Sequence, residues 1–220
     1  MKKNINKDQI IETTLQLMKD KKDLRSLNLR EIARSLGCAH TNIYNYFPSY
    51  EDLLWEVHIT LKDIFFYLIT EEMKKTNDSK KRLQCFFAAF VNMYLDNTGW
   101  FRLAWQEYIG DTVPQRNIIH EEKISNKIGV YVFQICMDAY GDFVSRKRCE
   151  KSLHIAHCYI VGEISGYISN ANYDVRVAKE KIIRGAMEVF LLSMGISVKV
   201  APKPKDFLSA YRKDSFFFGK

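Results

Sequence analysis

The sequence lacks the common signatures of an enzyme site and of a membrane segment. Its 220 residues contain no G-x-S-x-G nucleophile motif, no phosphate-binding P-loop and no G-x-G-x-x-G dinucleotide motif. No uninterrupted apolar run approaches the roughly 18 residues that a membrane-spanning helix needs. The polar first residues do not resemble a secretory signal peptide. We therefore expect a cytoplasmic protein that is not an enzyme and that has no membrane partner.

Cysteine, proline and glycine are also sparse. The five cysteines form no C-x-x-C pair and are odd in number, which argues against a disulfide framework or a zinc ribbon and favours reduced thiols. Four prolines and ten glycines leave long stretches without a helix breaker. No alternating strand pattern of any length occurs. The predicted fold class is therefore all-α.

The charge of the chain is positive. Thirty-three Lys and Arg residues outnumber 26 Asp and Glu residues, which gives a net charge of +7 and an isoelectric point near 9.0. A basic protein suits a polyanion such as DNA, although a basic surface is also a common aid to solubility. The charge thus supports a nucleic-acid partner without identifying one.

The segment from Asn28 to Leu54 carries the pattern of two short helices joined by a tight turn. Asn28 is a good N-cap, and Glu31 three residues later has the spacing to reach back to the cap. Apolar residues follow at helical spacing, and Gly37 then provides the backbone freedom that a sharp turn needs. A second short helix is expected over Ala39–Tyr46, because a proline follows closely and disfavours helical geometry before it. The segment is therefore predicted to be a helix-turn-helix.

The second helix is expected to present a polar face. Ile43 and Phe47 should point inward, which leaves hydrogen-bonding side chains and no acidic side chain on the other faces. Such a surface suits base edges and phosphates. Residues at the turn and at the start of the helix are predicted to contact base edges, and those farther along to hold phosphates. The predicted base contacts are Arg30, His40, Thr41 and Asn42, and the predicted phosphate contacts are Tyr44, Asn45, Tyr46 and Tyr50.

This segment resembles the DNA-binding head of the TetR (tetracycline repressor) family of bacterial transcriptional regulators. The resemblance lies in L-R-E-I-A-R-S-L-G-C followed by T-N-I-Y-N-Y-F-P-S-Y-E-D-L-L, in the first quarter of the chain. Two positions depart from the family pattern. Asn28 replaces the usual threonine and keeps the capping function. Tyr50 replaces the usual lysine, so a phosphate contact there would have to come from a hydroxyl group.

The resemblance implies a sequence-specific transcriptional regulator, usually a repressor that a small-molecule effector releases from its operator. It also implies a homodimer that binds a pseudo-palindromic site on double-stranded DNA. Two alternatives stay open. One is a nucleoid-associated DNA-binding protein of the same fold that is not a transcription factor, and the other is a helical metal-binding protein or enzyme in which the head is incidental. Mapping of genomic sites and metal analysis would distinguish them.

Helical periodicity continues through the rest of the chain, and about nine helices are predicted in all. A first helix over Lys7–Lys21 completes a three-helix head, and Ser49 begins a long helix without proline or glycine. The predicted domains are a helix-turn-helix domain over residues 1–47, a ligand-binding and dimerisation domain over residues 48–200, and a phenylalanine-rich tail without helical period over residues 201–220. Further helices are expected over Ser79–Asp96, Gly99–Ile109, Asn117–Tyr140, Ser145–Ser169 and Val175–Gly195, with a helix breaker at Asn97–Gly99.

Aromatic residues crowd the region between Phe86 and Phe133. For any one of them an ordinary core position is the simplest interpretation. Together, however, aromatic side chains with polar tips suit a pocket for an apolar or aromatic ligand, and the family resemblance implies an effector in this region. The candidate ligand-binding residues are Phe90, Tyr94, Trp100, Trp105, Tyr108 and Phe133.

The family resemblance also implies that the last two body helices form the dimer interface. Gly162 and Gly166 stand four residues apart, a spacing that permits close helix approach but is a weak signal outside membranes. Packing within one chain is the competing explanation. The candidate interface residues are Gly162, Gly166, Ile183, Met187, Phe190 and Leu191.

One group of potential metal ligands occurs. His154, His157 and Cys158 have i, i+3 and i+4 spacing on one predicted helix. The sequence identifies no further ligand, and polar residues in helical cores are commoner than metal sites, so no metal and no cofactor is predicted. No E-x-x-H sequence is present, which argues against a di-iron bundle. His58 and His120 are isolated, and we expect them at the surface.

Overall fold

The computed structural model describes residues 5–141, 144–170 and 174–197. Within these ranges the chain forms nine α-helices and one 3₁₀ turn and has no strand, which confirms the all-α prediction. None of the helices in this part of the chain is both long and apolar enough to cross a bilayer. The predicted tail over residues 201–220 lies outside the described residues. The elements are α1 (Lys7–Met18), η1 (Leu24–Ser26), α2 (Leu29–Leu36), α3 (Thr41–Tyr44), α4 (Tyr50–Lys74), α5 (Ser79–Leu95), α6 (Thr98–Trp105), α7 (Gln115–Tyr140), α8 (Arg146–Ser169) and α9 (Val175–Ser193).

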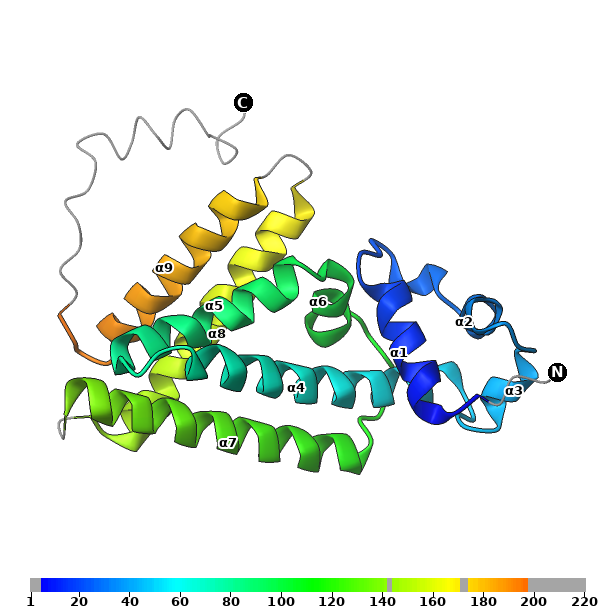
Figure 1. Ribbon diagram of the computed structural model, residues 1–220, viewed down its shortest axis with the longest axis horizontal. Coiled ribbons are helices and arrows are strands. Elements are labelled where there is room, and N and C mark those ends of the chain that lie inside the picture. The colour runs from blue at the N-terminus through cyan, green and yellow to red at the C-terminus, as the bar shows by residue number, and fades with distance from the viewer. Residues whose placement is uncertain (1–4, 142–143, 171–173, 198–220) are drawn as a thin grey trace.

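Helices α1 to α3 form a small head at one end of the molecule, and α4 to α9 form an elongated body (Figure 1). Each head helix contributes apolar side chains to the centre of the head. Ile10 and Met18 of α1, Ile32 of α2 and Ile43 of α3 are completely buried, and Phe47 closes the same core. The predicted inward positions of Ile43 and Phe47 are therefore confirmed.

The turn between α2 and α3 is built largely as the sequence predicts. Gly37 has φ 70° and ψ 36°, the left-handed conformation that glycine adopts without strain. The Asn28 side chain accepts hydrogen bonds from the backbone N–H groups of Arg30 and Glu31, both at 3.1 Å. The carboxylate of Glu31 was expected to return to the cap, and this prediction is wrong. It binds the Lys21 ammonium group at 3.0 Å, because a charge-assisted pair is stronger than a bond to a neutral N–H.

Helix α3 covers only Thr41–Tyr44 and is shorter than the predicted Ala39–Tyr46. The backbone on both sides of it closes tighter i to i+3 hydrogen bonds, for example from the Tyr46 N–H to the Ile43 carbonyl at 2.9 Å. Periodicity of side chains does not distinguish one α-helical turn from the 3₁₀ turns beside it. The predicted length was wrong for this reason.

Helix α4 connects the head with the body. Ser49 caps it, since its Oγ accepts a hydrogen bond from the Asp52 N–H at 3.0 Å. The helix then runs for 25 residues without interruption, which is a length of about 37 Å. Its buried face packs on α1 in the head and on α5 and α7 in the body. The long uninterrupted helix predicted from Ser49 is confirmed.

A second connection joins the start of α6 to the end of α1. The Gly99 N–H donates to the Lys19 carbonyl at 2.9 Å, and Trp100 Nε1–H donates to the Leu15 carbonyl at 2.9 Å. A Cβ atom on Gly99 would stand 1.7 Å from the Met18 carbonyl oxygen, so only glycine fits. This glycine was predicted to end a break between two helices and to begin the next one. It lies inside the first turn of α6, which starts one residue earlier than predicted, and its small size permits the contact with α1.

One carboxylate ties the head to two body helices. Glu56 of α4 pairs with Lys7 of α1 at 2.7 Å and with Arg116 of α7. Beside it, Asn117 Nδ2 donates to the Trp55 carbonyl at 2.9 Å. The Glu56 side chain is only 14% exposed, so both of its ion pairs are partly shielded from water. Helices α1, α4 and α7 are therefore held at a common junction.

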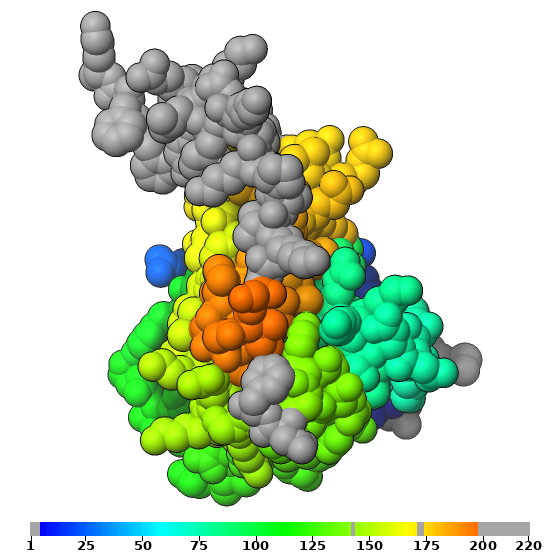
Figure 2. Space-filling model, turned by 90° about the vertical axis from the view of Figure 1, so that its left-hand side faces the viewer, coloured from blue at the N-terminus to red at the C-terminus, as the bar shows by residue number. Residues whose placement is uncertain are grey.

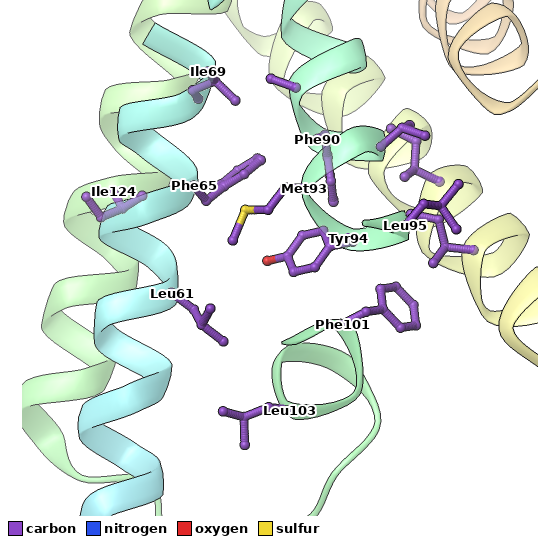
Figure 3. Packing of buried hydrophobic residues seen from close by; sticks show 14 of the residues in the cluster. Leu61, Phe65, Ile69, Phe90, Met93, Tyr94, Leu95, Phe101, Leu103 and Ile124 are labelled. Carbon is purple, nitrogen blue, oxygen red and sulfur yellow. The ribbon is translucent and has the colours of Figure 1, made fainter. Parts of the chain in front are cut away.

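The centre of the body is aromatic. Figure 3 shows Tyr94 of α5 between Phe65 of α4 and Phe101 of α6, with its hydroxyl group directed toward α4. The Tyr94 and Phe101 rings meet edge to face at 5.8 Å, and the Phe65 and Phe90 rings do so at 5.0 Å. Such pairs add about 0.5 to 1.5 kcal/mol each beyond the burial of their area. This packing fixes α5 relative to α4 and α6.

Helices α8 and α9 lie side by side along the body (Figure 1). A Cβ atom on Gly185 of α9 would stand 2.0 Å from the Tyr159 hydroxyl oxygen, so this glycine makes room for the tyrosine of α8. Figure 2 shows, from the end of the body opposite the head, that the last turns of α9 (orange) lie beside the yellow-green start of α8. There Arg148 Nη1 donates to the Met194 carbonyl at 3.4 Å.

Candidate nucleic-acid interface and body cavity

The exposed side of the helix-turn-helix contains a shallow hollow. It lies between the N-terminal end of α2, helix α3 and the start of α4, and no acidic side chain of the described chain lines it. A hollow of this kind presents N–H and O–H donors to an anionic surface. Its residues are Asn28, Leu29, Arg30, His40, Tyr44, Pro48, Ser49 and Tyr50.

Four of the eight predicted DNA-contact residues line this hollow, and six of the eight are exposed. The rings of His40 and Tyr44 meet edge to face at 6.3 Å, and the Tyr44 side chain is 49% exposed. Asn42, at the second position of α3, is half-buried. The exposed members of the predicted set are Arg30, His40, Thr41, Tyr44, Asn45 and Tyr46.

Two tyrosine hydroxyl groups are not available in the way the sequence suggests. The Tyr46 hydroxyl donates to the Ile5 carbonyl and so fastens the segment that precedes α1. The Tyr50 hydroxyl is buried and has no hydrogen-bond partner in the described structure. Burial and the nearby carboxylates of Glu31 and Glu107 raise the pKa of the Tyr50 phenol. A phosphate contact by Tyr50 would require its ring to rotate outward.

A cavity of about 380 Å³ lies inside the body, and we refer to it as the body cavity. It is bounded by α4, α5, α6, α7 and α8. Its walls are mainly aromatic and aliphatic, with a few charged groups and two histidines. The lining residues are Lys62, Phe65, Phe86, Phe90, Tyr94, Trp105, Glu121, Ile124, Ser125, Asn126, Ile128, Gly129, Glu150, Leu153, His154 and His157.

The body cavity contains three of the six predicted ligand-binding residues, namely Phe90, Tyr94 and Trp105. The other three do not line it. Trp100 packs against α1 through its hydrogen bond to Leu15. Tyr108 is exposed and binds Asp111, and Phe133 packs on the core elsewhere along α7. Sequence spacing could not separate these aromatics, because their positions depend on how α6 and α7 cross α5.

Two polar side chains that line the body cavity contact Trp105. Lys62 lies over the Trp105 ring, with Nζ 4.4 Å from its centre, and pairs with Glu121 at 3.2 Å. The His157 ring stacks on Phe90 at 5.6 Å and lies 4.7 Å from Trp105. Burial lowers the pKa of His157, and the ammonium group of Lys62 lowers it further. The sequence analysis did not select Lys62, because one lysine in a long amphipathic helix carries no distinguishing signal.

His58 was expected at the surface, and this prediction is wrong. The residue is half-buried beside Trp55, with 5.8 Å between ring centres. Burial and the Lys62 charge lower its pKa to about 4, although Glu121 acts in the opposite direction. His120 is also half-buried and its Nε2 lies 2.9 Å from Asp63 Oδ1.

The predicted dimer residues fall into three groups. Gly162 and Gly166 are exposed on α8, and a Cβ atom on either would meet nothing within 4 Å. Ile183, Met187 and Leu191 of α9 are half-buried. Phe190 is completely buried, and its ring packs edge to face on Phe87 at 5.6 Å. Internal packing, the alternative that the sequence left open, therefore describes Phe190.

The glycine spacing on α8 does not serve the contact between α8 and α9. That role belongs to Gly185, as described above, whereas the two glycines of α8 face open space. The exposed surface of α8 and α9 also carries apolar side chains, including Ile155, Val177 and Leu192. A sequence with small residues on both helices gives no sign of which glycine faces the neighbouring helix.

These features define a class of protein: a helix-turn-helix head on a helical body that contains a cavity. No family model and no curated protein matches the chain. Solved structures do, at low sequence identity. FadR from Bacillus subtilis in complex with stearoyl-CoA has 15% identity and a TM-score of 0.62, over 87% of this chain and 100% of that chain.

Two further structures are similar to the chain. A TetR-family transcriptional regulator from Bordetella parapertussis has 17% identity and a TM-score of 0.61, over 84% of this chain and 93% of that chain. A TetR variant from Acinetobacter baumannii in complex with minocycline has 16% identity and a TM-score of 0.54, over 85% and 95% of the two chains. The chain therefore has the fold of the TetR-family transcriptional regulators, as the resemblance in the head implied.

Proposed function

We propose that this protein is a sequence-specific DNA-binding transcriptional regulator, a repressor that a small molecule releases from its operator. The observation that carries the proposal is the exposed hollow beside the α2–α3 turn, which no acidic side chain of the described residues lines. Arg30 and His40 border the hollow, and Thr41 begins α3 beside it. Arginine and polar side chains at the start of such a helix are suited to base edges in the major groove.

We propose that the protein acts as a homodimer joined through α8 and α9. The exposed faces of these helices carry Gly162 and Gly166 together with apolar side chains. A dimer would present two heads to a pseudo-palindromic site, with the two α3 helices about one DNA turn apart, on the order of 34 Å.

We propose that the effector binds in the body cavity and is apolar or aromatic. A volume of about 380 Å³ falls within the range typical of small-molecule pockets. Phe90, Tyr94 and Trp105 offer flat apolar surface, and Lys62 with His157 offers polar contacts. Two of the structures that are similar in fold contain stearoyl-CoA and minocycline, which supports a ligand in the body.

The proposal is tested by mapping where the protein binds on its own genome and by titrating the recovered sequences with purified protein. A repressor should occupy few sites, beside promoters, and should bind them in preference to random DNA. Many dispersed sites with little sequence preference would favour the nucleoid-associated alternative. Mass spectrometry of the protein under native conditions should recover the effector, because a bound apolar ligand often survives purification.

A further inference from the structure

A cluster of metal-ligating side chains lies on α8 beside the body cavity. His154, His157 and Cys158 each offer one ligand atom, and these atoms all lie within 4.8 Å of one another. Both histidines also line the body cavity. We propose that these three residues form a binding site for a divalent transition metal ion of the zinc class at the rim of the body cavity.

The distances fit a tetrahedral ion after small movements. Zinc lies about 2.0 Å from an imidazole nitrogen and about 2.3 Å from a thiolate sulfur, so two ligand atoms on one ion stand roughly 3.3 to 3.8 Å apart. His154 Nε2 and Cys158 Sγ, at 3.7 Å, already have this separation. The other separations are at most 4.8 Å and would have to close by up to about 1 Å, which rotation of the exposed His154 and Cys158 side chains can supply.

His157 is held in place and has an unused ring nitrogen. Its Nε2 is buried and has no hydrogen-bond partner within the described residues. A buried polar atom without a partner is costly, so such an atom usually has a role. The neighbouring rings of Phe90 and Trp105 limit rotation of the imidazole. The ring is thus positioned before any ion arrives.

The ligand types select the class of metal. Two imidazoles and a thiolate favour zinc, cobalt or copper over magnesium or calcium, which prefer oxygen ligands. The positive charge of Lys62 is close, but Glu121 pairs with it at 3.2 Å. Glu150 lies one turn before His154, lines the same cavity and pairs with Arg146 at 2.8 Å. These carboxylates reduce the repulsion that a cation would meet.

Three protein ligands leave a fourth position on a tetrahedral ion. In catalytic and ligand-binding metal sites this position is taken by water or by a group of the bound molecule. The site lies at the rim of the body cavity, so a donor atom of a cavity ligand is a suitable fourth partner. The metal site does not depend on the proposed regulatory function, because it rests on α8 alone.

The site is tested by treating full-length protein with a chelator and titrating it with Co²⁺, followed by displacement with Zn²⁺. We expect one equivalent of Co²⁺ to bind, with the visible bands of a tetrahedral ion and a near-ultraviolet thiolate charge-transfer band. Cys158→Ser should abolish the thiolate band. His154→Ala and His157→Ala should each raise the Kd for Zn²⁺ by at least about 10- to 100-fold. Loss of a residue that only hydrogen-bonds to a metal ligand already has an effect of this size, and loss of the ligand itself should not be smaller.

Cys85→Ser is the matched control, because Cys85 is a half-buried cysteine on α5, away from the cluster. It should leave the thiolate band and the affinity unchanged. His154 and Cys158 are exposed, so their variants should keep the helical circular-dichroism spectrum of the parent. No Co²⁺ binding by the parent protein, or a thiolate band that survives in Cys158→Ser, would overturn the proposal. Either result would leave the DNA-binding function untouched.

Discussion

Trp100 Nε1 donates a hydrogen bond of 2.9 Å to the Leu15 carbonyl oxygen, and this bond joins a body helix to the last turn of the first head helix. In a continuing helix that carbonyl would accept from the Lys19 N–H, which bonds the Gln16 carbonyl instead. Trp100 thus satisfies a group that the end of α1 leaves free. Since α6 also carries Trp105 in the wall of the body cavity, one short helix contacts both the cavity and the head.

The two tryptophans of α6 should have separable effects. Trp105→Ala should weaken effector binding and leave operator affinity without effector nearly unchanged.

Trp100→Phe keeps an aromatic ring at this position but removes the indole N–H that donates to Leu15. This loss should lower the free energy of unfolding by about 1 kcal/mol and reduce the coupling between effector and operator. The intact coupling should be roughly 1 to 3 kcal/mol and reciprocal. Titrations of both ligands on one preparation measure it, and loss of operator binding in a folded Trp105→Ala dimer would contradict this assignment.

Gly99→Ala should strongly destabilise the contact between head and body. Its Cβ atom would stand 1.7 Å from the Met18 carbonyl oxygen, so α6 must move away from α1. We expect a loss of about 2 to 4 kcal/mol, as for other substitutions that force strain into a packed contact. Urea unfolding measures the loss. Gly129→Ala is the control, because a Cβ atom there meets nothing within 4 Å, and this change should stabilise α7 by roughly 0.5 to 1 kcal/mol.

Arg30 and Tyr44 should differ in how they affect DNA binding. Arg30→Ala should reduce the preference for operator over mutant sites by about 1 to 3 kcal/mol, the value of a good base contact. Tyr44→Phe removes only a hydroxyl group from an exposed ring and should weaken all sequences alike. Fluorescence anisotropy with operator and scrambled duplexes at one salt concentration distinguishes the two. Equal losses on both duplexes for Arg30→Ala would mean that this residue only positions the head.

Gly166→Arg should convert the proposed dimer into a folded monomer. A Cβ atom at this exposed position of α8 meets no atom of its own protomer within 4 Å, but an arginine side chain there would obstruct a partner that packs on α8. Gly129→Arg is the control, since it makes the same change at an unobstructed glycine of α7. Both variants replace a helical glycine and should gain roughly 0.5 to 1 kcal/mol of helix propensity. Light scattering after size-exclusion chromatography gives the masses, and a dimeric Gly166→Arg would place the interface elsewhere.

His58 should make the protein less stable in mild acid. Its folded-state pKa of about 4 lies below the ordinary value near 6.5, so between these values the unfolded chain binds a proton that the folded protein does not. The contribution of His58 to the free energy of unfolding is fully present above about pH 6.5. It is lost as the pH falls toward 4, by on the order of 2 to 3 kcal/mol. His58→Gln should flatten this dependence in urea unfolding at pH 7.5 and pH 5. Since His157 acts in the same direction, part of the slope should remain.

The head could be predicted well because its signals are local. A cap at Asn28, a glycine at the turn and apolar residues at helical spacing act over a few residues, and the structure contains each of them. The differences there are also local in origin. Glu31 pairs with Lys21 instead of with the backbone N–H of the cap. Helix α3 is shorter than predicted because 3₁₀ turns beside it are close in energy to a single α-helical turn.

The body could be predicted only as a set of helices. Trp100 and Trp105 are five residues apart on one helix, yet the first contacts α1 and the second lines the body cavity. Gly99 and Gly185 are needed for close contacts with Met18 and Tyr159, which are far away in the sequence. Such roles depend on how helices cross, and crossing angles follow from the packing of whole faces rather than from any short pattern.

Glu56 has a consequence for how operator binding should be interpreted. It holds Lys7 of the head and Arg116 of the body at once. The Lys7 and Arg116 side chains are 44% and 50% exposed, so salt still weakens these pairs although Glu56 is partly shielded, and the orientation of the head loosens. The same ions compete for DNA phosphates. The slope of log affinity against log salt concentration would then combine counterion release with weakening of the junction between α1, α4 and α7. Counting phosphate contacts from that slope in the parent protein would overstate their number. Glu56→Gln lacks both ion pairs at every salt concentration, so its slope would report the phosphate contacts alone.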